Sequence, residues 1–189
     1  MKTRLCVASY VTVVLATVLF SGVVGRAAAA AESGTTSGTV LESGETLTVK
    51  TEQGEEDTFF VQWVKKGEKW AREEMADIAL KKALRKGMPV TVKWSVGEQD
   101  RKYIEKLIAK GTVTGTVAAP REKGILLVRV EGIDGPMRFV SRWIKREGKW
   151  IPDPDEVALM ASVETGSTVS VSYELEEHLR INALTVAED

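Results

Sequence analysis

Polar and apolar residues alternate along most of the chain after residue 38, which is the period expected of β-strands with one buried face. This alternation predicts five short strands in the first half, over 38–41, 46–51, 58–64, 88–95 and 101–109. Between the third and the fourth, residues 71–86 place apolar side chains on one helical face, with acids early, bases late and a closing Gly87. We therefore expect three strands, a helix and two more strands.

The second half repeats the first at a nearly constant spacing. Matching residues form the pairs Leu47 and Leu126, Phe60 and Phe139, Trp63 and Trp143, Trp70 and Trp150, and Val92 and Val171. The spacing changes from 79 to 80 just before the tryptophans, which makes Arg142 the extra residue and predicts a β-bulge there. We interpret the pattern as a tandem duplication over 38–110 and 115–187. So few residues separate the copies that the last strand of one is expected to run into the first strand of the next.

A helix start is recognisable in the second copy. Asp153 supplies a cap, Pro154 occupies the first helical position and Glu156 the third. The helix is expected to end before Gly166, and the fifth strand of this copy is expected over 179–186. The second copy therefore repeats the element order of the first with a shorter helix.

Five strands with one helix between the third and the fourth is the element order of the OB-fold, a Greek-key barrel that binds oligonucleotides and oligosaccharides. The chain thus resembles two tandem OB-like five-stranded barrels in a mainly β protein. It is also similar to secreted bacterial proteins built from tandem OB-like domains of unknown function. That resemblance implies export and ligand binding and brings no catalytic residues. An SH3-like barrel is the alternative, but its usual connections leave no room for the sixteen-residue helix expected in the first copy.

Residues 1–31 have the three parts of a secretory signal peptide. Lys2 and Arg4 precede an apolar stretch over 5–24, and small residues follow over 27–31. We expect cleavage and export to the periplasm or the outside, with no membrane span afterwards. An uncleaved anchor is the alternative, because the apolar stretch nearly reaches the ~20 residues that cross a bilayer.

Composition excludes several kinds of site in the chain beyond this leader. The single cysteine, Cys6, lies in the leader, so disulfides, cysteine nucleophiles and thiolate metal sites are excluded from the remainder. His178 is the only histidine; we expect it to be solvated, with Glu176 and Glu177 favouring its protonated form. No phosphate-binding loop or nucleotide fingerprint is present. We therefore expect no enzyme activity, cofactor or metal.

Net charge argues against a nucleic-acid ligand. Without the leader, 23 Lys and Arg stand against 27 Asp and Glu, a net charge of about −4. The links between the fourth and fifth strands, 97–100 and 174–178, are acidic and would repel phosphate.

The most distinctive local feature is a pair of tryptophans seven residues apart that brackets a basic turn in each copy. The candidate ligand-binding residues are Lys65, Lys66, Lys69, Arg142, Lys145, Arg146, Lys149, Trp63, Trp70, Trp143 and Trp150. Such rings beside cations suit the stacking of sugars or bases and the binding of anions. The competing interpretation, which we favour for the tryptophans, is that the rings plug each barrel against its helix.

These observations predict an exported, non-catalytic binding or scaffolding module that contacts an acidic glycan or an envelope protein through its repeated basic turns. The alternative is a structural or assembly protein that uses the edge strands of its barrels. An oligonucleotide-binding OB protein and an envelope hydrolase come third.

Overall fold

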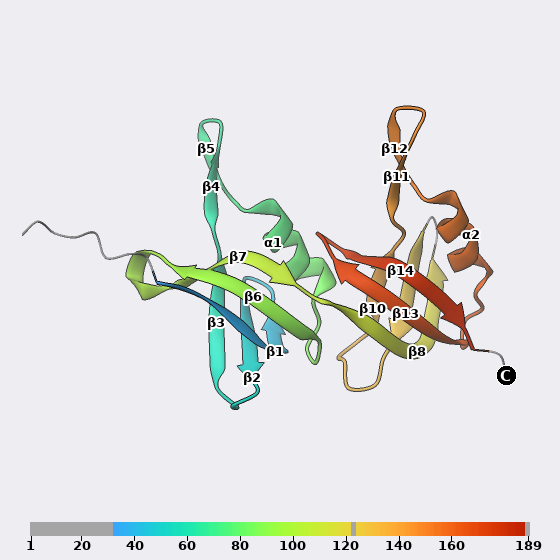
Figure 1. Ribbon diagram of the computed structural model, residues 1–189, viewed down its shortest axis with the longest axis horizontal. Helices are drawn as coiled ribbons and strands as arrows, with labels where there is room; N and C mark the ends of the chain where they lie inside the picture. Colours follow the sequence, from blue (N-terminus) through green and yellow to red (C-terminus); the bar gives the residue numbers. More distant parts are fainter. Residues whose placement is uncertain (1–31, 122–123, 188–189) are drawn as a thin grey trace, which may run out of the picture. The chain divides into compact units, whose positions relative to one another are not determined.

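The computed structural model describes residues 32–121 and 124–187, so the predicted signal peptide over 1–31 lies outside the described residues. Within the described part, two closed five-stranded barrels follow one another along the chain and belong to one compact unit (Figure 1). The predicted fold class, two tandem OB-like barrels, is confirmed.

The first barrel is formed by β1 (Ser33–Ser43), β2 (Thr46–Thr51), β3 (Glu56–Val61), β6 (Pro89–Val96) and β7 (Lys102–Ile108). Its strand order is β1-β2-β3-β7-β6, and β6 closes the barrel on β1. Only the pairing of β3 with β7 is parallel; the other pairings in this barrel are antiparallel. β1 is longer than expected because its first residues, which carry no apolar pattern, pair with β6.

The second barrel repeats this topology with β8 (Lys110–Arg121), β9 (Ile125–Arg129), β10 (Met137–Val140), β13 (Thr168–Leu175) and β14 (Leu179–Val186). Its one parallel pairing joins β10 to β14, which is the equivalent position. Only Ala109 separates β7 from β8, so the predicted run of one barrel's last strand into the next barrel's first strand is confirmed.

Strand register places the extra residue of the second copy away from Arg142. Leu47 lies opposite Phe59, and its counterpart Leu126 lies opposite Phe139. The buried Phe59, rather than Phe60, is therefore equivalent to Phe139, and the spacing is already 80 in β3. The extra residue belongs to the turn between β9 and β10, and the bulge predicted at Arg142 is wrong because the chain has left the barrel there.

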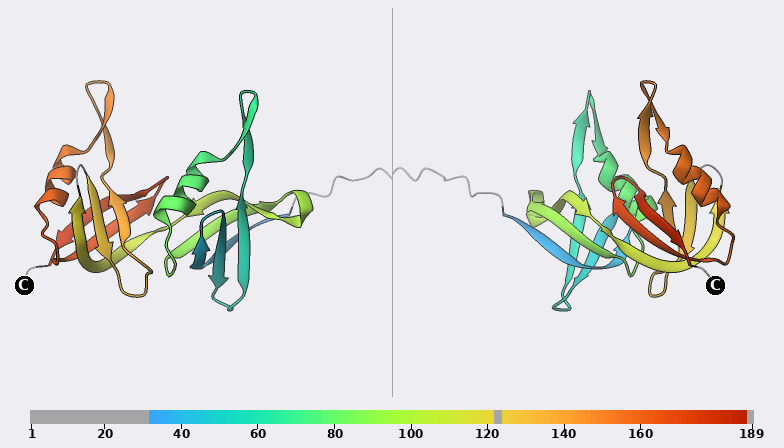
Figure 2. Two further views of the ribbon diagram at one scale, coloured as in Figure 1. Left: turned by 180° about the vertical axis from the view of Figure 1, so that it is seen from behind. Right: turned by 45° about the vertical axis from the view of Figure 1, so that its right-hand side comes forward.

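The chain leaves each barrel as a separate two-stranded hairpin between the third strand and the helix. These hairpins are β4 (Trp63–Lys66) with β5 (Lys69–Arg72), and β11 (Trp143–Arg146) with β12 (Lys149–Pro152). The predicted third strand over 58–64 was therefore wrong in its last residues. Figures 1 and 2 show each hairpin standing clear of its own barrel.

The helical segment of the first copy is shorter than the sixteen residues predicted for it. α1 (Glu74–Ile78) continues into a π-helical turn, η1 (Ala79–Ala83), and α2 (Pro154–Ser162) starts at the predicted cap. A short 3₁₀ turn, η2 (Glu98–Asp100), joins β6 to β7. The helix predicted over 71–86 begins late because β5 takes its first residues.

The π-helical turn absorbs a single extra residue of the first copy. Glu73 caps the first helix and Leu84 ends it, whereas Asp153 and Val163 mark the ends of the second, which is one residue shorter. The amide of Leu84 donates to the carbonyl of Ala79, five residues back, at 2.9 Å. A π-helical turn holds one residue more than an α-helical turn, so both helices deliver the chain to the next strand in the same way.

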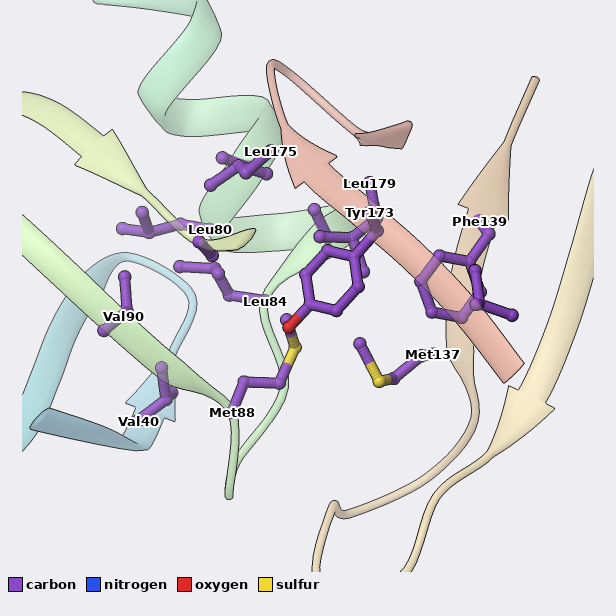
Figure 3. Close-up of a cluster of buried hydrophobic side chains, with 14 of the residues drawn as sticks. Val40, Leu80, Leu84, Met88, Val90, Met137, Phe139, Tyr173, Leu175 and Leu179 are labelled. Atoms are coloured by element: carbon purple, nitrogen blue, oxygen red, sulfur yellow. The ribbon is translucent and has the colours of Figure 1, made fainter. Parts of the chain in front are cut away.

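One continuous hydrophobic core joins the two barrels. Figure 3 shows Leu84 and Met88 of the first barrel beside Tyr173, Leu175 and Met137 of the second. Each of these side chains is at least 93% buried. The end of the first helix thus packs against one end of the second barrel.

Backbone contacts fix the same interface. Asp134 N donates to Lys86 O at 2.9 Å, and Leu175 N donates to Ala109 O at 2.7 Å. At Gly87, which has φ +93°, an added Cβ would lie 2.1 Å from the carbonyl oxygen of Gly132. The barrels approach so closely here that only glycine fits.

Gly166 provides a matched control for this contact, since it has φ +94° at the equivalent position and nothing within 4 Å of its absent Cβ. Alanine at either site pays a similar backbone cost of about 1 to 3 kcal/mol. We expect Gly87→Ala to lower the free energy of unfolding by at least about 1 kcal/mol more than Gly166→Ala, because only Gly87→Ala forces the barrels apart. Urea denaturation measures both, and equal losses would contradict the interface.

Candidate functional site

Register within the hairpins determines which side chains share a face. In the first hairpin Trp63 lies opposite Arg72 and Lys65 opposite Trp70, so these four side chains occupy one face. In the second, Trp143 lies opposite Pro152 and Lys145 opposite Trp150. Each hairpin therefore presents two indole rings and a lysine together.

All four hairpin tryptophans are exposed. Their exposed fractions are 61% for Trp63, 66% for Trp70, 49% for Trp143 and 64% for Trp150. The interpretation that these rings plug the barrels is wrong, because the hairpins carry them away from the core. Other aromatic residues fill the interiors, as Phe59 and Trp94 do in the first barrel.

Two of the predicted cationic residues are held in ion pairs that brace the hairpins. Lys66 Nζ lies 2.6 Å from Glu74 at the start of α1. Arg142 Nε lies 2.6 Å from Glu156 on α2, whose other carboxylate oxygen accepts from the Arg142 amide at 2.7 Å. Lys66, which lies next to the turn of the first hairpin, ties the far end of that hairpin to α1, whereas Arg142 ties the base of the second hairpin to α2.

The remaining predicted cations have no ion-pair partner within the described residues. They are Lys65 and Lys69 of the first hairpin and Lys145, Arg146 and Lys149 of the second. All five residues are exposed. Each hairpin thus combines exposed indole rings with cations that retain their capacity to bind anions.

A hollow of about 540 Å³ lies at the base of the first hairpin. Gln62, Trp63, Trp70, Glu98 and Tyr103 line it. Gln62, Glu98 and Tyr103 are not predicted as site residues from the sequence, because they come from three separate segments and belong to no motif. The signal available in the sequence was the outward position of Tyr103 on an alternating strand.

An aromatic row on the outer side of β3 and β7 supports this hollow. The ring centroids of Phe60 and Tyr103 are 6.2 Å apart, and the Arg101 guanidinium lies 5.0 Å from the Phe60 ring centroid. An added Cβ at Gly97 would meet the Tyr103 ring at 2.8 Å, so the missing side chain lets the β6–β7 link close over this ring.

The acidic link between β13 and β14 is partly neutralised by Arg180, a residue of the same barrel. The largely buried Arg180 binds Glu176 at 3.1 Å and Glu177 at 2.8 Å, and it donates to the carbonyl of Ser141 at 3.1 Å. The repulsion expected from this link is therefore reduced, whereas no ion pair in the described structure joins Glu98 of the first barrel to a cation.

His178 differs from its prediction. It is half-buried, and its Nδ1 atom is buried without a hydrogen-bond partner among the described residues. Burial lowers the pKa of His178, and the charges of Arg138, Arg180 and Lys82 lower it further against the opposing effect of Glu177. The neutral form is therefore favoured, contrary to the expectation drawn from the acidic neighbours.

Within residues 32–121 and 124–187 no group of three or more His, Cys, Asp and Glu side chains is placed to hold a metal ion. In the same part of the chain, no helix is long and apolar enough to cross a membrane.

Comparisons with protein-family models, curated proteins and solved structures find no match to this chain. Functional inference therefore depends on the geometry of the site.

Exposure predicts how the tryptophans affect stability. Trp70→Ala and Trp150→Ala should each change the free energy of unfolding by less than about 1 kcal/mol, because little buried surface is lost. Trp94→Ala should lower it by about 3 to 5 kcal/mol, since that ring lies in the core. Urea denaturation measures all three. A large loss on removal of a hairpin ring would mean that the hairpin packs against its barrel.

The lowered pKa of His178 predicts a pH effect with a definite sign. The unfolded chain takes up a proton at this histidine near pH 6.5, while the folded chain resists it. The free energy of unfolding should therefore fall as the pH falls below about 6.5. His178→Gln should make this pH dependence weaker, by an amount that corresponds to at most one bound proton. Urea denaturation from pH 7.5 to 5.5 tests this, and an unchanged slope in the variant would contradict it.

Proposed function

We propose that this protein is a non-catalytic binding module whose two hairpins bind an acidic glycan. The observation that carries the proposal is the repeated combination, in both hairpins, of exposed indole rings with exposed cations that form no ion pair within the described residues. These cations are Lys65 and Lys69 in the first hairpin and Lys145, Arg146 and Lys149 in the second. Export through the predicted leader would bring the module to the cell envelope or the outside, where such glycans occur.

Ring and cation contribute different parts of the binding energy. An exposed indole offers a flat apolar face to the C–H side of a sugar ring, and the neighbouring lysine or arginine binds its carboxylate or sulfate. Because the hairpins are short and are tied to the neighbouring helices by Lys66 and Arg142, these side chains are presented on ordered backbone. Less entropy is then lost on binding than in a flexible loop.

Two equivalent hairpins also favour a polymeric ligand over a small one. Each hairpin alone offers a shallow, solvent-exposed contact of modest affinity. A long glycan that reaches both hairpins makes the second contact intramolecular, which raises its overall affinity when the geometry allows both contacts.

Assembly through barrel edges has less support. Both barrels are closed, so their strands leave no free edge along the barrel wall. Pairing between copies would have to use the four-residue strands of the hairpins, which are short and rich in lysine. Both features discourage edge-to-edge pairing.

Charge reversal on the second hairpin tests the proposal. Lys145→Glu with Arg146→Glu should weaken binding of oligogalacturonate or a sulfated oligosaccharide at least tenfold, because two attractive contacts become repulsive. Titration followed by tryptophan fluorescence measures the affinity, and wild-type affinity should fall as salt rises.

Lys93 and Lys106 supply a control of equal charge change. They are exposed, lie opposite each other on β6 and β7, and are outside the hairpins. Lys93→Glu with Lys106→Glu should leave affinity within about twofold of wild type. Equal losses in the two double variants would show a general charge effect and overturn the assignment to the hairpins.

A further inference from the structure

We infer that the first barrel, and not the second, holds a subsite for one uncharged sugar ring of the bound glycan, in the hollow lined by Gln62, Trp63, Trp70, Glu98 and Tyr103. This inference rests on the proposed function and makes it more specific. It assigns recognition of the sugar itself to one barrel, whereas the cations of both hairpins recognise only charge.

The lining chemistry fits a pyranose ring. Trp63 and Trp70 lie on the same face of the hairpin and more than half of each is exposed, which makes them available for stacking. Gln62 offers an amide and Glu98 a carboxylate, and both can hydrogen-bond hydroxyl groups. A concave site of about 540 Å³ with aromatic walls and a few polar groups has the size and composition of a small-ligand pocket.

Rigid backbone positions the polar side of the hollow. The Glu73 amide donates to the backbone carbonyl of Gln62 at 2.7 Å, which ties the base of the hairpin to the start of α1. Glu98 lies in η2, where a hydrogen bond of 3.0 Å from Gly97 N to Arg101 O closes the link. Both polar side chains therefore project from backbone that is held by hydrogen bonds.

The equivalent place in the second barrel has different chemistry. Strand register aligns Tyr103, which lies opposite Phe60 on β3, with Arg180, which lies opposite Val140 on β10. Arg180 is largely buried and engaged with Glu176 and Glu177, so it offers no stacking surface.

The second barrel also differs at the positions that correspond to the polar residues Gln62 and Glu98. Arg142 replaces Gln62 between the third strand and the hairpin, and its guanidinium is bound to Glu156. The link between β13 and β14 holds only Glu176, Glu177 and His178, which is shorter than the link that carries Glu98. Both hairpins thus keep their tryptophans, but only the first completes the hollow with an amide, a carboxylate and a tyrosine.

Glu98 also favours a sugar over a nucleobase as the occupant. An aromatic hollow of this kind stacks either ring, but a nucleotide brings a phosphate beside each base. Glu98 and the neighbouring Asp100 are unpaired in the described structure and would repel it. Hydroxyl groups, by contrast, donate readily to a carboxylate.

Neutral oligosaccharides separate this subsite from the charge contacts. The full chain is titrated with neutral hexasaccharides of glucose, galactose, mannose and N-acetylglucosamine, with oligogalacturonate, and with a thymidine oligonucleotide. Wild-type protein should bind at least one neutral hexasaccharide, with an affinity that changes less than twofold between low and physiological salt.

Matched tryptophan variants locate the binding. Trp70→Ala should weaken the neutral hexasaccharide at least tenfold, whereas Trp150→Ala, at the equivalent position of the other hairpin, should change it less than twofold. Tyr103→Leu and Glu98→Gln should each weaken it at least threefold. Thermal unfolding of every variant verifies that it is folded before its affinity is compared.

The outcomes distinguish the two proposals. Equal losses for Trp70→Ala and Trp150→Ala, or binding of oligogalacturonate with no binding of any neutral hexasaccharide, would overturn the subsite and leave the proposed function standing. Neutral binding localised by the variants, without binding of acidic glycans, would support the subsite and overturn the proposed function. Binding of the oligonucleotide alone would overturn both.

Discussion

The contact between the end of the first helix and one end of the second barrel is the constraint on which the rest of the structure depends. Leu84 and Met88 are buried there against Tyr173 and Leu175, in a core that runs through both barrels. The barrels share this core, and only Ala109 lies between the last strand of one and the first strand of the next. The two barrels are therefore packed together and are not separate domains joined by a flexible linker. The close approach at Gly87 has the same origin, since a side chain there would meet the backbone of the other barrel.

The end of the first barrel that corresponds to this interface carries charged side chains in place of apolar ones. Met137 and Leu179 of the second barrel are fully buried near this interface, and strand register makes Asp57 and Lys102 their counterparts in the first. Asp57 and Lys102 form an ion pair of 2.5 Å that retains about a quarter of its surface. Covering it with another barrel would desolvate both charges, which is costly. The corresponding ends of the two barrels therefore differ, one being polar and the other apolar.

The barrels contain the buried core of the molecule, whereas the hairpins expose their large side chains to solvent. The barrels bury their apolar alternation and close their edges, so they offer little to a ligand beyond a stable platform. The hairpins bury few large side chains and keep Trp63, Trp70, Trp143 and Trp150 in solvent. These tryptophans recur in both copies although they lie outside the core, which is what the proposed binding role predicts. The copies differ near them, as at Tyr103 and Arg180, so the two hairpins have different surroundings.

The local sequence pattern was sufficient to predict the two similar halves and the order of strands and helix in each. It also predicted several element boundaries, including those of β2 and β14 and the capped start of α2. These features follow from alternation, capping chemistry and turn residues, which act between near neighbours in the chain. Tertiary structure alone decided that Trp63 and Trp143 leave the barrel while Trp94 stays inside, that Phe59 rather than Phe60 points inward, and that the surroundings of His178 lower its pKa. An apolar ring is buried or exposed according to what packs against it, and those partners come from distant segments that no local period specifies.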